Sequence, residues 1–204
     1  MKKYELTSES MNVFGKTLYR IKALVSFADV NAGDLGGFIE KEQNLSHEGS
    51  AWVYGDAQVC GNAWVCGNAR VYGDAWVCGN AWVCGNARVY GDAWVCGDAR
   101  VCDNAWVYGD ARVYGDAQVY GDARACGDAN ISNPASIRWI SNIGSRHDTT
   151  TFFRTRDNQI MVTCGCFRGT LDEFLKKVKE THGDNKYAQE YRLAAELAKV
   201  GVEL

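Results

Sequence analysis

The chain has 204 residues, which is enough for one large domain or two small ones, and its formal net charge is −3. This charge gives no overall basic field, so nucleic acid is not an expected partner. No apolar run reaches the length of a membrane span, and the first ten residues lack the apolar core of a signal peptide. We therefore expect a cytoplasmic protein that has no membrane partner.

The nine cysteines do not form the framework of a disulfide-bonded protein. Seven of them recur inside a repeat, and the other two, Cys164 and Cys166, form an isolated Cys-Gly-Cys. This is not the spacing of a zinc ribbon or of a small secreted domain. We expect reduced thiols, with no metal and no cofactor.

The first 50 residues precede the repeat and are predicted to cap it. Within this segment, Leu18–Leu24 is predicted as a strand and Gly33–Gly37 as a glycine-rich bend. A stack of short strands needs such a cap, because its open edge would otherwise pair with another chain.

A six-residue repeat begins at Ala51, continues to Asp128 and ends near Ile140 after two degraded units. Its first units are AWVYGD, AQVCGN, AWVCGN and ARVYGD. The alternation of a strand points Ala and Val to one side, and the second and fourth residues to the other. Gly with Asp or Asn then makes the bend, because these residues tolerate its backbone angles. The small apolar Ala and Val are the expected core.

A second period of 18 residues indicates that three units complete one turn. The spacing of 18 holds for one set of tyrosines, namely Tyr54, Tyr72, Tyr90 and Tyr108. An 18-residue gene duplication would leave the same period, but its unit would still be three hexads. The fifteen units of residues 51–140 then give five coils, about 24 Å tall at roughly 4.8 Å per strand. We predict an all-β solenoid, a parallel β-helix, followed by a small α+β module over residues 141–204.

The unit Ala-x-Val-x-Gly-Asp/Asn resembles the hexapeptide repeat of left-handed parallel β-helix proteins. This resemblance implies a left-handed coil, and it is specific for the fold but not for a function. The stretch that begins LYRIKALVSF and ends EGSAWV, over residues 17–53, is similar to uncharacterised phage and prophage hexapeptide-repeat proteins. That second resemblance implies a phage-derived protein in the host cytoplasm, and it brings no established chemistry.

The best-known enzymes with this repeat are acyltransferases, which usually carry a catalytic histidine on or beside the coils. Here no insertion interrupts residues 51–128, and no histidine occurs between His47 and His147. The zinc carbonic anhydrases of this fold need three histidines from the coils, and these coils supply none. We therefore predict a non-enzymatic protein, with His47 as the remaining candidate base at the cap.

The register of the repeat places six tryptophans on the outside of the coils. They are Trp52, Trp64, Trp76, Trp82, Trp94 and Trp106. Arginines on neighbouring strands allow cation–π contacts worth roughly 0.5–1 kcal/mol each. Aromatic surface of this extent is typical of an interface, although these columns could instead only stabilise the coil surface. We predict a homo-oligomer, a trimer or a dimer, that uses the six tryptophans.

The C-terminal module is predicted as a β-hairpin followed by two helices. Its strands are 149–156 and 159–167, joined by a two-residue turn at Asp157-Asn158. In that register Phe153 shares one face with Val162, and Phe152 lies on the other face. Thr170 and Glu173 form a capping box that opens the first helix. The module caps the coils, forms a separate unit, or does both.

The start of that helix is the predicted ligand site. Arg168 and Gly169 place a cation and an open backbone beside free helix N–H groups, which suits an anion such as a nucleotide phosphate. The alternative is ordinary capping with solvated arginines, and Asp172 and Glu173 favour that alternative because they already complement the helix dipole. The predicted binding residues are Ser145, Arg146, His147, Arg154, Arg156, Arg168, Gly169 and Thr170.

Three functions follow from these patterns. The first is a binding protein that binds or sequesters a host component or a nucleotide-like anion. Its resemblance to phage proteins implies that it is phage-derived and acts in counter-defence. The second is a hexapeptide acyltransferase, which binding of acetyl-CoA would favour. The third is a purely structural scaffold, which the absence of any ligand or partner would favour.

Overall fold

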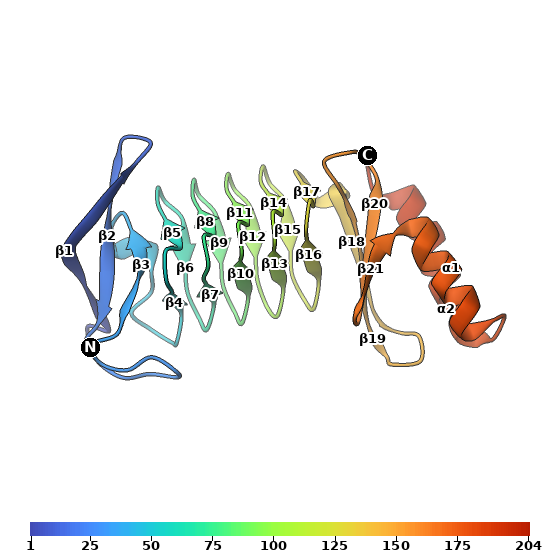
Figure 1. Ribbon diagram of the computed structural model, residues 1–204, viewed down its shortest axis with the longest axis horizontal. Helices are drawn as coiled ribbons and strands as arrows, with labels where there is room; N and C mark the ends of the chain where they lie inside the picture. Colours follow the sequence, from blue (N-terminus) through green and yellow to red (C-terminus); the bar gives the residue numbers. More distant parts are fainter.

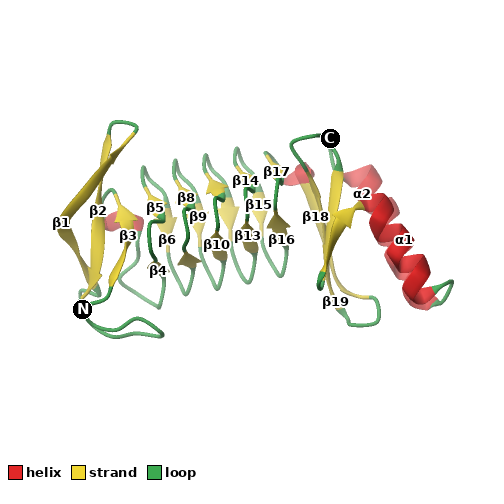
Figure 2. Ribbon diagram, in the orientation of Figure 1, coloured by secondary structure: helices red, strands yellow, loops and turns green.

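The computed structural model describes every residue from Met1 to Leu204. Stacked coils form an elongated body with a small sheet at each end, and two helices lie beyond the C-terminal sheet (Figures 1 and 2). None of the helices has the length and apolarity needed to cross a bilayer.

The N-terminal cap is an antiparallel sheet of β1 (Tyr4–Val13), β2 (Lys16–Ala23) and β3 (Leu35–Ile39). The predicted strand near Leu18 is confirmed as part of β2, whereas β1 was not predicted. Strand β3 also pairs in parallel with the first coil, which joins the cap to the stack. A short 3-10 helix, η1 (Glu42–Asn44), follows, and Leu45 then bridges to Val65. The coil path therefore begins before Ala51.

Fourteen strands of two or three residues form the coils and lie on the three sides of a prism. The first side holds β4 (Trp52–Val53), β7 (Arg70–Val71), β10 (Arg88–Tyr90), β13 (Trp106–Tyr108) and β16 (Arg124–Cys126). The second holds β5 (Gln58–Val59), β8 (Trp76–Val77), β11 (Trp94–Val95), β14 (Arg112–Val113) and β17 (Asn130–Ile131). The third holds β6 (Trp64–Val65), β9 (Trp82–Val83), β12 (Arg100–Val101) and β15 (Gln118–Val119).

Neighbouring strands of each side are parallel and 18 residues apart in sequence, as the pair Arg88 and Trp106 shows. The predicted β-solenoid of about five turns is therefore confirmed. Its left hand stays a prediction from the resemblance.

The interior of the prism is filled by the Ala and Val columns of the repeat. From Ala51 to Val119 each of these side chains is at most 1% exposed. Burial of one such valine contributes roughly 1.5–3 kcal/mol relative to its exposure. The columns are uniform because every coil encloses the same triangular space, so a larger side chain in one coil would have to displace its neighbours.

The corners are held by close backbone packing and by side-chain amides. Gly79 has φ +69°, and a Cβ there would lie 2.8 Å from the backbone nitrogen of Gly97 in the next coil. Both the angle and the contact favour glycine. Side-chain amides also bond along a corner: Asn62 donates to Asn80 at 3.2 Å, and Asn80 donates to Asp98 at 2.9 Å. These bonds tie each coil to the next.

The last coil ends earlier than predicted. The unit that begins at Ala135 leaves the coil, because η2 (Pro134–Ser136) turns the chain into β18 (Ile137–Ile143) of the C-terminal sheet. Regular pairing of the coils therefore stops at Ile131 rather than near Ile140.

The C-terminal sheet has four antiparallel strands in chain order, where one hairpin was predicted. They are β18, β19 (Asp148–Arg154), β20 (Ile160–Cys164) and β21 (Phe167–Thr170). One face, with Phe153, packs on the core of the coils, and the other, with Phe152 and Val162, packs on the helices. The predicted helices are confirmed as α1 (Leu171–His182) and α2 (Lys186–Gly201), on the far side of the sheet in Figure 2.

The predicted register of the hairpin was wrong by one residue. Arg154 pairs with Ile160, and the Thr155 N–H donates to the Gln159 carbonyl at 2.9 Å, so the loop holds the three residues 156–158 rather than two. Asn158 within it takes a positive φ of 55°. A three-residue loop of this type is common in hairpins. Because side chains alternate along a strand, the shift exchanges the faces of Phe152 and Phe153.

Candidate functional site

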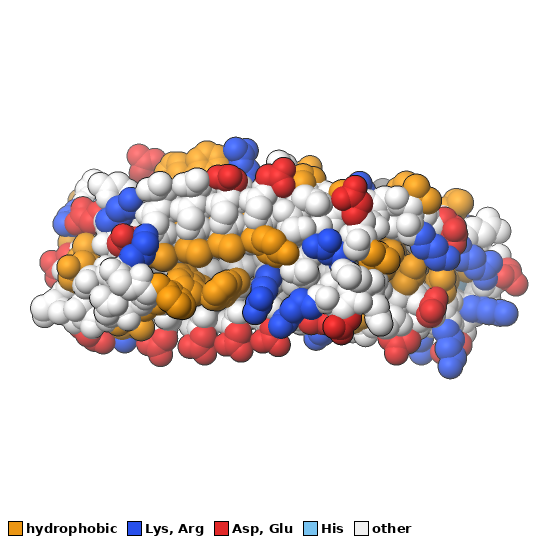
Figure 3. Space-filling model, turned by 90° about the horizontal axis from the view of Figure 1, so that it is seen from above, with side chains coloured by type: hydrophobic (Ala, Val, Ile, Leu, Met, Phe, Trp, Pro, Cys, Tyr) orange, Lys and Arg blue, Asp and Glu red, His pale blue; other side chains and the backbone are white.

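The tryptophan columns lie on the sides of the prism, and three of these side chains are well exposed. Trp64, Trp82 and Trp94 have 38–39% of their surface in solvent. Figure 3 shows hydrophobic side chains in rows along the solenoid, with a row of acidic side chains beside them. These rows follow from the 18-residue register, which stacks like residues on neighbouring strands.

Trp52 was wrongly predicted to belong to the exposed interface. It is only 1% exposed, because the N-terminal cap covers it: the Phe27 ring lies 5.5 Å from the Trp52 ring and the Tyr4 ring lies 6.0 Å away. Trp76 is partly covered as well, since Phe14 at the tip of the β1–β2 turn stacks on it at 5.0 Å. The exposed aromatic surface therefore excludes Trp52 and is reduced at Trp76.

Arginines do pack on the tryptophans as predicted. Trp106 lies between two guanidinium groups, with Arg88 at 4.9 Å and Arg124 at 5.0 Å from its ring. Arg100 lies 5.5 Å from the Trp82 ring, on the neighbouring strand. These contacts lend the columns stability, which keeps the purely structural interpretation open beside the interface.

His47 is placed as part of the cap. Its Nδ1 accepts a hydrogen bond from the backbone N–H of Lys3 at 3.2 Å, and its ring stacks on Tyr4 at 4.4 Å. Burial lowers its pKa, opposed by the nearby Glu42 carboxylate. With Nδ1 already occupied, the imidazole acts as a packing and hydrogen-bonding group of the N-terminal sheet.

The arginines predicted to surround one anion are dispersed. Arg154 donates to the Asn130 carbonyl at 3.1 Å and to the Ser132 hydroxyl at 2.8 Å. Arg156 donates to the Asp110 carbonyl at 3.3 Å. Both side chains thus bind groups of the last coils and fasten the C-terminal sheet to them.

Arg168 is also turned toward the coils. A Cβ placed on Gly127 would collide with its guanidinium group, so the two residues are in close contact. The exposed His147 lies in the β18–β19 turn, with a φ of 52°. The structure therefore does not bring Arg154, Arg156 and Arg168 to the same place as Arg146.

The start of α1 is closed by its own capping box. The Thr170 backbone N–H donates to the Glu173 carboxylate at 2.8 Å, and the Glu173 N–H donates to the Thr170 hydroxyl at 3.3 Å. A Cβ on Gly169 would lie 2.7 Å from the same carboxylate, so Glu173 fills the space that a ligand would need. The alternative of ordinary capping describes this helix end.

Two of the predicted residues, Ser145 and Arg146, line a pocket between the C-terminal sheet and the helices. Its volume is about 230 Å³. The sheet and its turns contribute Ser145, Arg146, Cys164, Cys166 and Phe167, and the helices contribute Phe174, Lys177, Val178, Thr181, His182 and Tyr191. The lining combines an apolar floor with the cationic Arg146 and Lys177, and it contains no carboxylate.

The floor of this pocket is fixed by packing and hydrogen bonds. The Phe174 ring lies edge-on to the Tyr191 ring at 5.5 Å, and the thiol of Cys164 donates to the Tyr191 hydroxyl at 3.8 Å. The Thr150 hydroxyl donates in turn to Cys164 at 3.3 Å. Burial raises the pKa of Tyr191, so its hydroxyl stays protonated at neutral pH.

Lys177, His182 and Tyr191 were missed as site residues. Their helices were predicted, but the sequence does not show which helix face turns toward Arg146. A signal was present in the spacing of Phe174, Lys177 and Val178, which places Lys177 beside the apolar stripe of α1.

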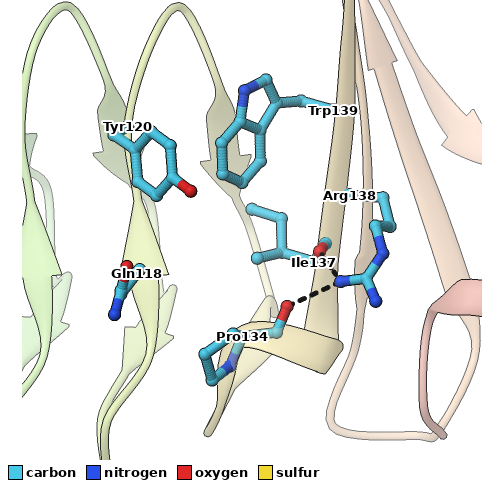
Figure 4. A pocket seen from close by; sticks show the side chains of 6 residues that line it. All are labelled: Gln118, Tyr120, Pro134, Ile137, Arg138 and Trp139. Atoms are coloured by element: carbon cyan, nitrogen blue, oxygen red, sulfur yellow. Dashed lines mark hydrogen bonds between the residues drawn. The ribbon is translucent and has the colours of Figure 1, made fainter.

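A second hollow lies at the seam between the last coils and the C-terminal sheet (Figure 4). It has a volume of about 260 Å³ and is lined by Gln118, Tyr120, Pro134, Ile137, Arg138 and Trp139. Arg138 donates to the Pro134 carbonyl at 2.8 Å and to the Ile137 carbonyl at 2.9 Å, drawn as dashed lines in Figure 4. Because its guanidinium group is engaged in this way, the hollow is a packing seam and a weaker candidate for a site.

The family model of the YdcK beta-solenoid repeat matches residues 63–79, 81–97, 99–115 and 105–121, all within the coils. No curated protein matches the chain. The chain is thus a repeat β-solenoid protein whose central coils are similar to the YdcK beta-solenoid repeat.

Proposed function

We propose that this protein is a non-enzymatic binding protein whose C-terminal pocket takes a small anionic ligand with an apolar part. The observation that supports it is the lining of the pocket, where the cationic Arg146 and Lys177 lie beside the apolar Phe174 and Val178 and no carboxylate is among the lining residues. Glu180, outside the lining, lies 3.6 Å from the Lys177 ammonium and competes with a ligand for it. An anion beside two cations is favoured most where the surroundings exclude water.

The volume of the pocket limits the size of the ligand that fits inside it. About 230 Å³ lies below the usual 300–1,000 Å³ of sites for drug-sized molecules. A whole nucleotide would therefore extend out of the pocket, with its base or its phosphate inside. A carboxylate with a short acyl or aromatic group would fit within it.

Titration calorimetry tests this proposal with inorganic phosphate, AMP, ATP and octanoate as probes. Arg146→Ala and Lys177→Ala should each weaken binding by about tenfold or more, because a hydrogen bond to a charged group contributes about 1.5–3 kcal/mol. Lys176→Ala is the matched control, since Lys176 is the exposed neighbour on the same helix and does not line the pocket. Absence of binding by all four probes, or equal loss in the two lysine variants, would exclude this site.

An acyltransferase is the alternative activity. Against it stand the lack of a histidine on the coils and the use of the His47 Nδ1 in a cap hydrogen bond. We expect no acetyl transfer from acetyl-CoA to amines or hydroxyls. Turnover that disappears in His47→Ala would establish the enzyme instead.

Phage origin and a counter-defence role form the finer part of the proposal, supported by the resemblance of residues 17–53 to phage and prophage proteins. In this role the protein would sequester a host molecule in the cytoplasm, and its nine free cysteines suit a reducing compartment.

We also propose self-association through the exposed Trp64, Trp82 and Trp94. Light scattering should show a dimer or a trimer at micromolar concentration. A monomer there would leave the tryptophans as surface packing of a structural scaffold.

A further inference from the structure

Two rows of thiols run along the coils, and no function discussed so far uses them. The first row is Cys60, Cys78 and Cys96, and the second is Cys66, Cys84 and Cys102. Each cysteine directly follows a strand, at the same position of its hexad. In the first row the Cys60 N–H donates to the Val77 carbonyl and the Cys78 N–H to the Val95 carbonyl, both at 2.9 Å. Consecutive thiols are therefore held one strand spacing apart, about 4.8 Å.

The spacing between neighbouring sulfur atoms favours a linear site, in which one metal ion lies between two thiolates. A tetrahedral zinc site needs four ligands around one point, and no group of three or more thiols, imidazoles or carboxylates in this chain is placed to hold one ion. A zinc–sulfur bond is about 2.3 Å, so two metal–sulfur bonds of similar length laid end to end span about 4.6 Å, which is close to the strand spacing. Soft thiolate ligands select soft ions such as Cu(I).

The first row also has groups that favour an anionic metal–thiolate pair. The Trp76 indole N–H donates to the Cys60 sulfur at 3.4 Å. The Lys16 ammonium is held beside this end of the row, because its Glu40 partner also accepts a hydrogen bond from the backbone N–H of Gly61, next to Cys60.

The second row lacks these groups. None of its three sulfurs accepts a side-chain hydrogen bond like the one from Trp76 to Cys60. The two rows thus present the same spacing of sulfur atoms with different stabilisation of the thiolate.

From the spacing and the neighbours of the first row we infer that it binds a soft monovalent cation, Cu(I), in a linear site between two thiolates of adjacent coils. Binding breaks two S–H bonds, releases both protons to water and forms two S–metal bonds, with no change of oxidation state. The Trp76 N–H and the Lys16 ammonium lie at Cys60, so Cys60 and Cys78 are the favoured pair, and the half-buried Cys78 is its more accessible thiol. The second row binds a further ion more weakly.

The experiment is an anaerobic titration of the reduced full-length protein with Cu(I), against a chromogenic Cu(I) chelator as competitor. Cys78→Ser removes the central thiol of the first row and leaves its two remaining sulfurs about 9.6 Å apart, two strand spacings, which is too far for one ion. Cys84→Ser is the matched control, because it makes the same change at the centre of the second row.

We expect Cys78→Ser to weaken binding of the first Cu(I) at least tenfold and Cys84→Ser to leave that ion unchanged. Equal effects of the two substitutions, or no effect of either, would overturn the inference. X-ray absorption of the wild type with one Cu(I) bound supplies a readout that needs no variant. Two sulfur neighbours are expected, and three sulfurs or any nitrogen or oxygen neighbour would also overturn it.

Discussion

Trp52 and Trp94 occupy the same position of the repeat in very different surroundings, and this difference predicts unequal losses of stability. Trp52 is 1% exposed beneath Phe27 and Tyr4, whereas Trp94 is 39% exposed on the second side of the prism. Replacement of a buried tryptophan by alanine costs about 3–5 kcal/mol, because apolar burial is lost and a cavity remains. For Trp94→Ala we expect about 1–2 kcal/mol, since part of its area is already in solvent and no closed cavity forms.

These losses are measurable against the stability of the whole chain. At roughly 0.05–0.15 kcal/mol per residue, 204 residues correspond to about 10–30 kcal/mol. Guanidinium unfolding followed by far-UV circular dichroism should therefore shift its midpoint clearly more for Trp52→Ala than for Trp94→Ala. Trp52→Phe should recover part of the loss, because it refills most of the cavity. Equal shifts for the two alanine variants would show that the cap does not pack on Trp52 as described.

Three further predictions concern the corners, the capping box and the N-terminal lysine. Gly55→Ala should destabilise the protein by about 1–2 kcal/mol, because Gly55 has a positive φ, and Gly79→Ala should destabilise it clearly more. Gly79 also has a positive φ, but in addition a Cβ there would lie 2.8 Å from the backbone of the next coil. Thermal unfolding compares the two variants, and similar losses of stability would contradict the corner packing. Glu173→Ala should cost about 0.5–2 kcal/mol by opening the capping box of α1, whereas Asp172→Ala, which removes no cap bond, should cost less in the same assay. Burial lowers the pKa of Lys3 from 10.5 to about 8, so between these pH values the unfolded chain binds more protons than the folded one. The stability of the wild type relative to Lys3→Met should therefore rise as the pH increases from about 8 to 10.5. A difference in unfolding midpoints that does not change with pH would refute the assignment.

The solenoid could be predicted from sequence because its rule is local and repeated. Each hexad carries its own core residues and its own corner, and the 18-residue period alone brings Trp106 beside Arg88. The turn at Asp157-Asn158 shows where this reasoning stops, since two-residue and three-residue loops both suit these residues. One residue of difference was enough to exchange the faces of Phe152 and Phe153.

The candidate site was only partly predictable, because the roles of the arginines depend on contacts between segments distant in sequence. The last coils leave backbone carbonyls without a partner strand, and such groups need donors. Arg154 and Arg156 supply them at Asn130 and Asp110, and are thereby removed from the anion site. Arg146 has no such contact with the coils and lines the pocket with Lys177 from α1. Only the packing of α1 and α2 on the sheet reveals that pairing.

The uniform coils give this protein a length that can change in fixed steps. Each coil bonds to its neighbours through the same backbone groups and the same corner amides, as in the series Asn62, Asn80 and Asp98. Duplication or deletion of any 18 consecutive residues in the middle of the stack would therefore move the two end sheets apart or together by about 4.8 Å and leave both intact. The distance between the N-terminal cap and the C-terminal pocket can therefore change only in steps of one coil, and selection could adjust it without altering the residues of either end.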